Sequence, residues 1–257
     1  MRAVIKGHAS INGETVRYRQ WAPEYERIQA EFGFSFDREV AASERLVSLL
    51  PKPALERAEQ RIRARVRGRD TIVVGLAPRS GAPPVWMLPR AEVPPALVVA
   101  DGATERCLAG GLVPDVVVTD LDGPIPSEVT ANVRGSLVLI HAHGDNIPAL
   151  ERWVPEFPGE LAGSWAGPPE RGLVDFGGFT DGDRAAYLAE YVGAPRILLF
   201  GFDFHHVDPR DPSPEVKGRK LAAARRALDL LAREGRSRIE LWASDGTLSP
   251  YVPQSTQ

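Results

Sequence analysis

The chain has 257 residues, enough for one sizeable α/β domain with a small extra lobe or for two compact domains. Its 31 Lys and Arg against 34 Asp and Glu give a net charge of −3, which favours neither a nucleic-acid-binding protein nor a membrane-surface protein. The single cysteine, Cys107, excludes an intramolecular disulfide framework and a cysteine-based zinc site.

Three helices are predicted before residue 70, each from apolar residues that recur on one helical face. Pro51 ends the second helix, and Pro53 suits the first turn of the third. We therefore predict an N-terminal helical lobe over residues 1–70. The apolar faces consist of Trp21, Tyr25, Ile28 and Phe32 in the first helix, Val40, Leu46, Val47 and Leu50 in the second, and Leu55, Ile62 and Val66 in the third.

From Thr71 onward, short β-rich runs alternate with helical stretches. Their Val, Ile and Leu residues are continuous rather than alternating with polar residues, as strands buried on both faces require. With helices between the strands, we predict an α/β fold with a doubly wound, mostly parallel sheet over residues 71–257. The predicted strands lie in "TIVVGLA", "ALVVADGA", "DVVVTDLDG", "SLVLIHAHGD", "RILLFGFDF" and "RIELWAS".

Four of these predicted strands end in a carboxylate. A single Asp at such a position is often a turn residue or a helix N-cap. In an open parallel sheet, however, the carboxyl ends of the strands form the ligand crevice, so these acids are expected to converge. Their mutual repulsion requires a cation, and Mg²⁺ prefers oxygen ligands. The acids are Asp101, Asp120 with Asp122, Asp145, and Asp203.

Two helix starts downstream add candidate phosphate contacts. In "GGFTDGDRAAYLAEYVGAP", Thr180 is a natural N-cap, and Asp183 would complete a capping box with it. Asp181 would complement the helix dipole there, and the bare glycine backbone before it could cradle phosphate. The helix after Pro214 carries Lys217 and Lys220 in its first turn, where the dipole disfavours cations. This misfit allows contact with ATP phosphates, although a solvated helix face is the ordinary alternative.

The motif "DLDG" alone leaves three chemistries open. A D-x-D pair serves as nucleophile and acid in haloacid-dehalogenase-type phosphatases, as a metal clamp in nucleotide-sugar glycosyltransferases, and as a Mg²⁺ site in pyrophosphate transfer. The phosphatase motif requires threonine where Pro124 stands, and it should follow the first strand rather than the third. In "HAHGDN", we expect the histidines to pack at the strand end and Asp145 to be the useful ligand.

Four motifs in order carry a family resemblance: "VVADGAT", "VVVTDLDG", "HAHGDN" and "GGFTDGDRA", followed by "GFDF" and "KGRKL". This series resembles archaeal-type 6-hydroxymethyl-7,8-dihydropterin pyrophosphokinases, the MptE-like family, which are related to thiamine pyrophosphokinase catalytic domains. The resemblance covers roughly residues 70–235 and implies a Rossmann-like catalytic domain over 71–257. Residues 160–174 are more Gly/Pro-rich than the family pattern, which makes acceptor selectivity the open point.

The resemblance implies Mg²⁺-dependent transfer of pyrophosphate from ATP to the hydroxymethyl group of the dihydropterin, with release of AMP. The expected partners are these small molecules, without nucleic acid or membrane, and a homo-oligomer is left open. A thiamine pyrophosphokinase-like enzyme and a non-catalytic nucleotide-binding or glycosylation-associated relative are the alternatives. The N-terminus lacks a signal-peptide core, and no apolar run approaches the roughly 20 residues that span a bilayer, so we expect a cytoplasmic protein. The resemblance implies that Asp120, Asp122 and Asp145 are catalytic, and that the same three residues bind the metal together with Asp181. It implies nucleotide contacts from Asp101, Gly102, Thr180, Asp181, Lys217 and Lys220.

Overall fold

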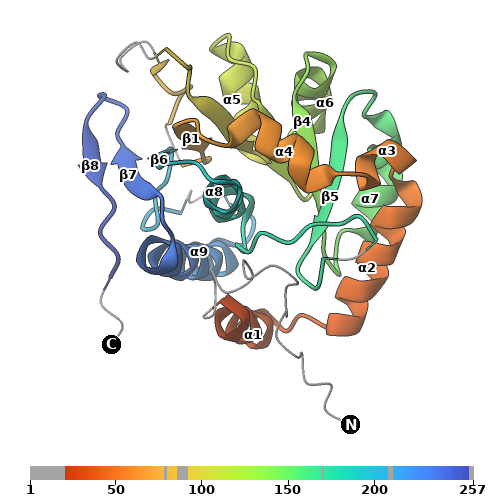
Figure 1. Ribbon diagram of the computed structural model, residues 1–257. Coiled ribbons are helices and arrows are strands. Elements are labelled where there is room, and N and C mark those ends of the chain that lie inside the picture. Colours follow the sequence, from red (N-terminus) through yellow and green to blue (C-terminus); the bar gives the residue numbers. More distant parts are fainter. Residues whose placement is uncertain (1–20, 78–79, 86–91, 170, 208–210, 255–257) are drawn as a thin grey trace.

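The computed structural model describes residues 21–77, 80–85, 92–169, 171–207 and 211–254 (Figure 1). Residues 1–20 of the predicted lobe lie outside this range. The described chain forms an eight-stranded sheet in the order β5-β4-β3-β2-β1-β6-β7-β8, parallel except for the β7–β8 pair. The chain therefore winds outward from β1 in both directions, which confirms the predicted doubly wound α/β sheet. The strands are β1 Thr71–Val74, β2 Ala96–Ala100, β3 Val116–Thr119, β4 Leu137–Ala142, β5 Leu161–Trp165, β6 Arg196–Phe200, β7 Arg238–Trp242 and β8 Leu248–Pro250.

Helices cover both faces of the sheet. Alternate residues of each strand point to opposite sides, so Val73 packs with one helical layer and Ile72 with the other. One layer contains α1 (Trp21–Phe32), α4 (Ala58–Val66), α8 (Asp181–Val192) and α9 (Pro214–Glu234). The other contains α5 (Thr104–Ala109), α6 (Ile125–Val133) and α7 (Ile147–Trp153). Short 3₁₀ turns precede α5 at Asp101–Ala103 (η2) and follow α7 at Val154–Glu156 (η3).

The helices before residue 70 are distributed around the sheet. Helix α1 lies against α9, and Trp21 contacts Tyr187 of α8 with ring centroids 5.1 Å apart. Helix α2 (Phe36–Leu49) runs along the β5 edge beside α7 and is followed by α3 (Lys52–Leu55) (Figure 1). These helices share their apolar residues with the two cores of the sheet. The start of α2 is thereby held next to the turn after β4, where a Cβ atom on Gly144 would lie 2.7 Å from Arg38.

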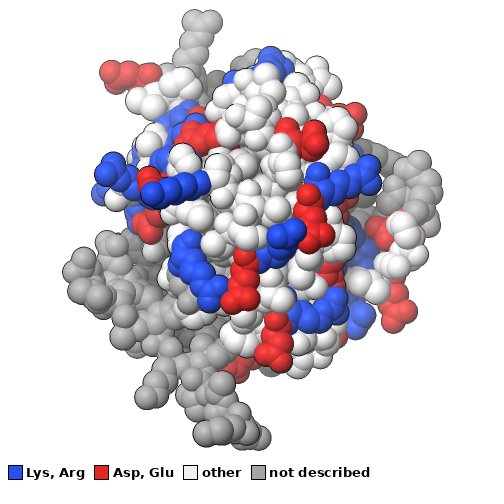
Figure 2. Space-filling view, turned by 90° about the vertical axis from the view of Figure 1, so that its right-hand side faces the viewer, with Lys and Arg blue, Asp and Glu red and all other residues white. Residues whose placement is uncertain are grey.

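Charges of both signs are interspersed on the side of the molecule where α2, α3 and α7 lie (Figure 2). Arg45 of α2 pairs with Glu151 of α7 at 2.8 Å, and Arg171 pairs with Glu44 at 3.0 Å. Among the described residues, no helix combines the length and the apolar character that crossing a bilayer requires.

The structure differs from the local predictions in three places. The single helix predicted from Pro53 is broken into α3 and α4, because Arg57 adopts a left-handed conformation with φ of 53°. Strand β5 was not predicted, since "LAGSW" contains Gly and Ser rather than a continuous apolar run. Gly163 is needed there because a Cβ atom would lie 2.4 Å from Leu173 and 2.7 Å from Leu50. The short antiparallel β8 was also not predicted.

Candidate active site

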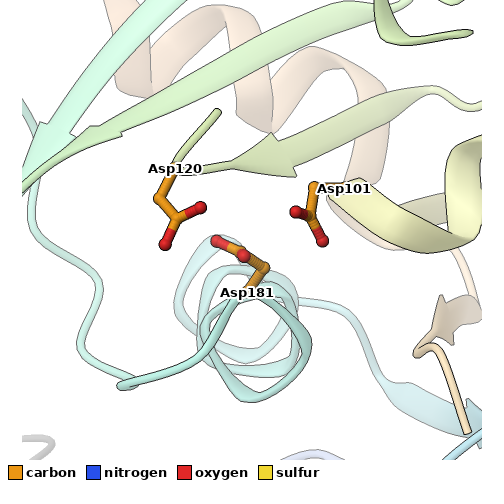
Figure 3. Close-up of side chains that lie close together, drawn as sticks. All are labelled: Asp101, Asp120 and Asp181. Atoms are coloured by element: carbon orange, nitrogen blue, oxygen red, sulfur yellow. The ribbon is translucent and has the colours of Figure 1, made fainter. Parts of the chain in front are cut away.

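Three carboxylates meet at the carboxyl edge of the sheet. Asp101 directly follows β2, Asp120 directly follows β3, and Asp181 is the first residue of α8. One oxygen from each lies within 4.8 Å of the others, and Figure 3 shows the three side chains pointing toward one another. The strand ends lie in this crevice because neighbouring parallel strands stop at the same edge. The convergence predicted for Asp101 and Asp120 is therefore present.

The electrostatics of the cluster are those of crowded acids. Burial, followed by the charges of Asp120 and Asp101, raises the pKa of Asp181 well above its usual range. Burial also raises the pKa of Asp101, and both the hydrogen bond to Asp122 and the charge of Asp122 add to this rise. Asp122 lines the same cavity, and its pKa is raised by burial and then by Asp120. A bound cation would relieve this repulsion, and carboxylate oxygens are the ligands that Mg²⁺ prefers.

Asp120 is the acid that remains ionised. Burial opposes its charge, but the hydrogen bond from His143 and the positive charges of His143 and Arg184 lower its pKa. His143 Nε2 lies 3.4 Å from Asp120 Oδ2. The chain turns sharply after Asp120, because Leu121 is a buried non-glycine residue with φ of 68°. Backbone strain of this kind is concentrated at functional sites.

The start of α8 leaves Asp181 free to face the cluster. Asp183, rather than Asp181, accepts the backbone N–H groups of Phe179 at 2.6 Å and Thr180 at 2.8 Å. The predicted capping box between Thr180 and Asp183 is thus confirmed. Gly178 precedes it with φ of 86°, and a Cβ there would lie 2.4 Å from Arg184 Cα. Position 178 therefore requires glycine, because any side chain there would collide with the backbone of α8.

The acids lie in a cavity of about 640 Å³. On the β1 and β6 side of the acids, the backbone of Gly75, Gly102 and Gly201 lines it, together with Lys217 and Lys220 of α9. On the β4 side, the lining is formed by the aromatic and polar side chains of Tyr25, Phe34, Glu39, His141, His143 and Phe179. Phe202 and Phe204, which follow β6, also line the cavity on the side of the glycines and lysines. The β1 and β6 side is called the glycine- and lysine-lined half, and the side with Tyr25, Phe34, Glu39 and Phe179 is called the aromatic half.

Asp145 does not join the cluster. Its carboxylate pairs with Arg38 at 2.7 Å, and both side chains are more than half exposed, at 55% and 64%. The turn after β4 is fixed by Asn146, whose amide donates to the carbonyl oxygens of Asp120 at 2.9 Å and His141 at 2.8 Å. This turn directs His143 toward Asp120. The other predicted residues line the cavity: Asp101, Gly102, Asp120, Asp122, Thr180, Asp181, Lys217 and Lys220.

Sequence reasoning did not single out Glu39, Arg184 or His143 as site residues. His143 belongs to "HAHGDN", a motif in which the sequence favours Asp145 as the metal ligand. Glu39 lies one turn before Ala42 and two turns before Leu46, so it stands on the apolar face of α2. An acid in such a stripe is a signal for a buried carboxylate, and it is 2% exposed in the structure.

The fold and the cavity are those of an α/β enzyme whose ligands bind at the carboxyl edge of a parallel sheet. A family model described as "6-hydroxymethylpterin diphosphokinase MptE-like" matches residues 57–208. The chain belongs to this MptE-like family, as its four ordered motifs predicted.

Three relatives carry the name 6-hydroxymethyl-7,8-dihydropterin pyrophosphokinase. The protein of Methanothermobacter thermautotrophicus is 38% identical over 234 residues, which cover 86% of this chain and 98% of the relative. The Pyrococcus furiosus protein is also 38% identical, over 87% of this chain and 98% of its own. The Methanocaldococcus jannaschii protein is 31% identical over 77% of this chain and 85% of its own.

Among solved structures, the MAf glycosyltransferase from Magnetospirillum magneticum AMB-1 is similar with a TM-score of 0.35 and 18% identity. The match covers 61% of this chain and 28% of that chain. This likeness is too distant to inform the function.

Proposed function

We propose that the protein transfers pyrophosphate from ATP to the hydroxymethyl group of 6-hydroxymethyl-7,8-dihydropterin and releases AMP. The observation that carries the proposal is the meeting of Asp101, Asp120 and Asp181 in the cavity of a chain 38% identical to two relatives named for this pyrophosphokinase activity. Both partners in the proposed reaction are small molecules, and the proposed use of ATP supports a cytoplasmic location.

The three clustered carboxylates fit a hard divalent cation. We assign Asp101, Asp120 and Asp181 as its ligands and Asp122 as a close neighbour that bonds to Asp101. Mg²⁺ held there would neutralise the charge that develops on the phosphate oxygens. We leave Asp145 out of this set because Arg38 holds it at the surface.

The glycine- and lysine-lined half of the cavity suits the nucleotide. Lys217 and Lys220 line it from the first two turns of α9 and can contact phosphate oxygens. The charge of Lys220 offsets a small part of the rise that burial and Asp120 cause in the pKa of Asp122, which indicates that the Lys220 and Asp122 side chains are close. Gly75 and Gly201 let the β1 and β6 loops approach each other, since a Cβ on Gly75 would be 2.8 Å from the Gly201 oxygen.

The reaction itself is a substitution at the β-phosphorus. The hydroxymethyl oxygen loses its proton to solvent and bonds to that phosphorus, the bond from the phosphorus to the α–β bridging oxygen breaks, and this oxygen leaves with AMP. Catalysis then depends mainly on alignment and charge stabilisation. His143 and Arg184 lower the pKa of Asp120 against the effect of burial, which favours the charged carboxylate that a cation would need.

Product analysis tests the proposal. The purified protein is incubated with ATP, Mg²⁺ and either the hydroxymethyl dihydropterin or thiamine, and the products are separated by chromatography. We expect AMP to form in step with the pterin pyrophosphate. AMP formed only with thiamine would keep the chemistry and reject the pterin acceptor. ATP binding without AMP from either acceptor would reject an enzymatic role in favour of nucleotide binding alone.

A further inference from the structure

The aromatic half of the cavity contains a buried acid for which the transfer of pyrophosphate has no use. Glu39, near the start of α2, lines the cavity and is 2% exposed. Its Oε2 atom has no hydrogen-bond partner among the described residues. Because a buried carboxylate without full hydrogen bonding is costly, such a group is retained where a ligand supplies the missing donors.

The surroundings of Glu39 narrow the kind of ligand. Tyr25 is close enough that the Glu39 charge, after burial, contributes to raising the pKa of its hydroxyl. Phe34 and Phe179 also line this half, with ring centroids 6.1 Å apart. Aromatic walls around one carboxylate suit a flat heterocycle that carries N–H donors at its edge.

A dihydropterin has this chemistry. Its pyrimidinone ring presents the N3–H and the 2-amino group side by side, a donor pair that matches the two oxygens of a carboxylate. The hydroxymethyl group is at the opposite end of the bicyclic ring. In the structure, His143 Nε2 lies 3.4 Å from Asp120 Oδ2, and His143 is also close enough to Glu39 to influence the pKa of that carboxyl. Glu39 and the acidic cluster therefore face the same cavity with His143 between the two groups of contacts.

Resting on the proposed function, we propose that Glu39 is the specificity-determining residue for the acceptor: it accepts the N3–H and 2-amino hydrogens while Phe34, Phe179 and Tyr25 enclose the ring. This gives the N-terminal helices a role, because Tyr25 comes from α1, Phe34 from the turn after it, and Glu39 from α2. A site built to bond a substrate amino group strongly rejects an analogue that lacks it, since the carboxylate is then left unpaired.

The test compares two acceptors on wild-type protein and on Glu39→Gln. One acceptor is the hydroxymethyl dihydropterin, and the other is its 2-oxo analogue, in which a carbonyl oxygen replaces the amino group. We expect the wild type to prefer the amino compound by about 100-fold or more in kcat/KM. Glu39→Gln should raise the KM for the amino compound by about 30-fold and remove most of the preference. The KM for ATP should stay within about threefold, which also reports a folded site.

Two further variants separate the effect of the Glu39 carboxylate from the loss of any acid in α2 and from the loss of ring stacking. Glu44→Gln changes another acid of α2 that pairs with Arg171 on the surface, so it should leave both acceptor constants unchanged. Phe34→Leu should weaken both acceptors alike, about 10-fold, because stacking does not sense the amino group. An unchanged preference in Glu39→Gln would overturn the inference while the pterin activity of the wild type stood. Absence of pterin turnover in the wild type would overturn the proposed function and this inference with it.

Discussion

Gly123 lies directly against the carboxylate of Asp101. A Cβ atom at position 123 would be 2.6 Å from Asp101 Oδ2, which is shorter than real Cβ contacts, and 3.0 Å from its Cγ, which is tighter than most of them. The last residue of the "DLDG" motif therefore leaves room for an acid that arrives from a different strand. A larger residue there would move the Asp101 carboxylate without removing any charge from the cluster.

Gly123→Ala is expected to weaken Mg²⁺ binding about 10-fold, because it displaces the Asp101 carboxylate from its position as a ligand. A tenfold loss of affinity corresponds to about 1.4 kcal/mol of binding free energy. The Mg²⁺ concentration needed for half-maximal turnover at saturating ATP measures it. Gly81→Ala is the control, since no atom of the described residues lies within 4 Å of a Cβ atom at that position. Equal Mg²⁺ requirements in the two variants would show that the position of Asp101 is irrelevant to the metal.

Asp120→Asn and Asp145→Asn should separate the ligand set proposed from the structure from the one predicted from the sequence. The first removes the ionised acid of the cluster, and we expect turnover to fall by about 10³-fold with the circular dichroism spectrum unchanged. The second removes an exposed pair worth at most about 1 kcal/mol, so turnover should stay within about threefold. A comparable loss in both variants would mean that Asp145 does serve the site.

The contrast between Asp120 and Asp145 shows what the sequence could predict. Parallel topology brings strand ends to one edge, so acids that directly follow β2 and β3 had to converge. The direction of a side chain several residues after a strand depends on the turn, and here the hydrogen bonds of Asn146 select His143. Glu39 reaches the site through packing between α2 and β4, a contact between distant parts of the chain that no local pattern encodes.

The β5 strand shows a similar limit within the fold. Its apolar run is interrupted by Gly163 and Ser164, so its sequence does not have the Val and Ile content of the other strands. The reason lies in its neighbours: Leu173 and Leu50 occupy the space that a side chain at position 163 would take. Strand pairing with β4 and this packing together form the strand, and neither is visible in the local sequence.

Lys220→Ala is expected to raise the KM for ATP about 10-fold with a smaller effect on the KM of the acceptor. Lys220 lines the half of the cavity assigned to the nucleotide and lies close to Asp122, so its loss removes a cation next to the phosphates. Arg233→Ala, an exposed charge near the end of the same helix, is the matched control. Initial rates over a range of ATP and acceptor concentrations distinguish the two constants. A selective rise in the acceptor KM would place Lys220 in the other half.

Arg69→Ala should destabilise the fold while leaving the site intact. Arg69 donates to Asp115 at 2.9 Å and to the carbonyl oxygens of Pro94 and Pro95 at 3.0 Å, and Asp115 in turn accepts the Leu97 N–H. These bonds join the beginnings of β1, β2 and β3, the opposite edge from the cavity. We expect a loss of about 2–3 kcal/mol in urea unfolding, against at most about 1 kcal/mol for Arg45→Ala, whose pair is exposed. Equal losses would mean that the half-buried network of Arg69 adds nothing to the stability.

Glu128 of α6 should make the stability of the metal-free protein depend on pH. The side chain is fully buried beneath the "DLDG" turn, and neither carboxyl oxygen has a hydrogen-bond partner among the described residues. Burial, together with the charges of Asp120 and Asp122, raises its pKa to about 7, although the nearby Thr119 hydroxyl offsets part of the effect. In the unfolded chain the same group titrates at its ordinary value of 4.5.

The folded protein therefore binds this proton more tightly than the unfolded chain, and the free energy of unfolding falls as pH rises from 4.5 to about 7. At about 1.4 kcal/mol per pKa unit, the wild type should lose about 3 kcal/mol across that window through this group. Glu128→Gln cannot ionise, so its urea unfolding measured from pH 5 to 8 should have a correspondingly smaller slope. Because Asp101 and Asp181 contribute with the same sign in both proteins, the difference between the slopes isolates Glu128. Parallel pH profiles would show that this carboxyl ionises in the folded protein as readily as in water.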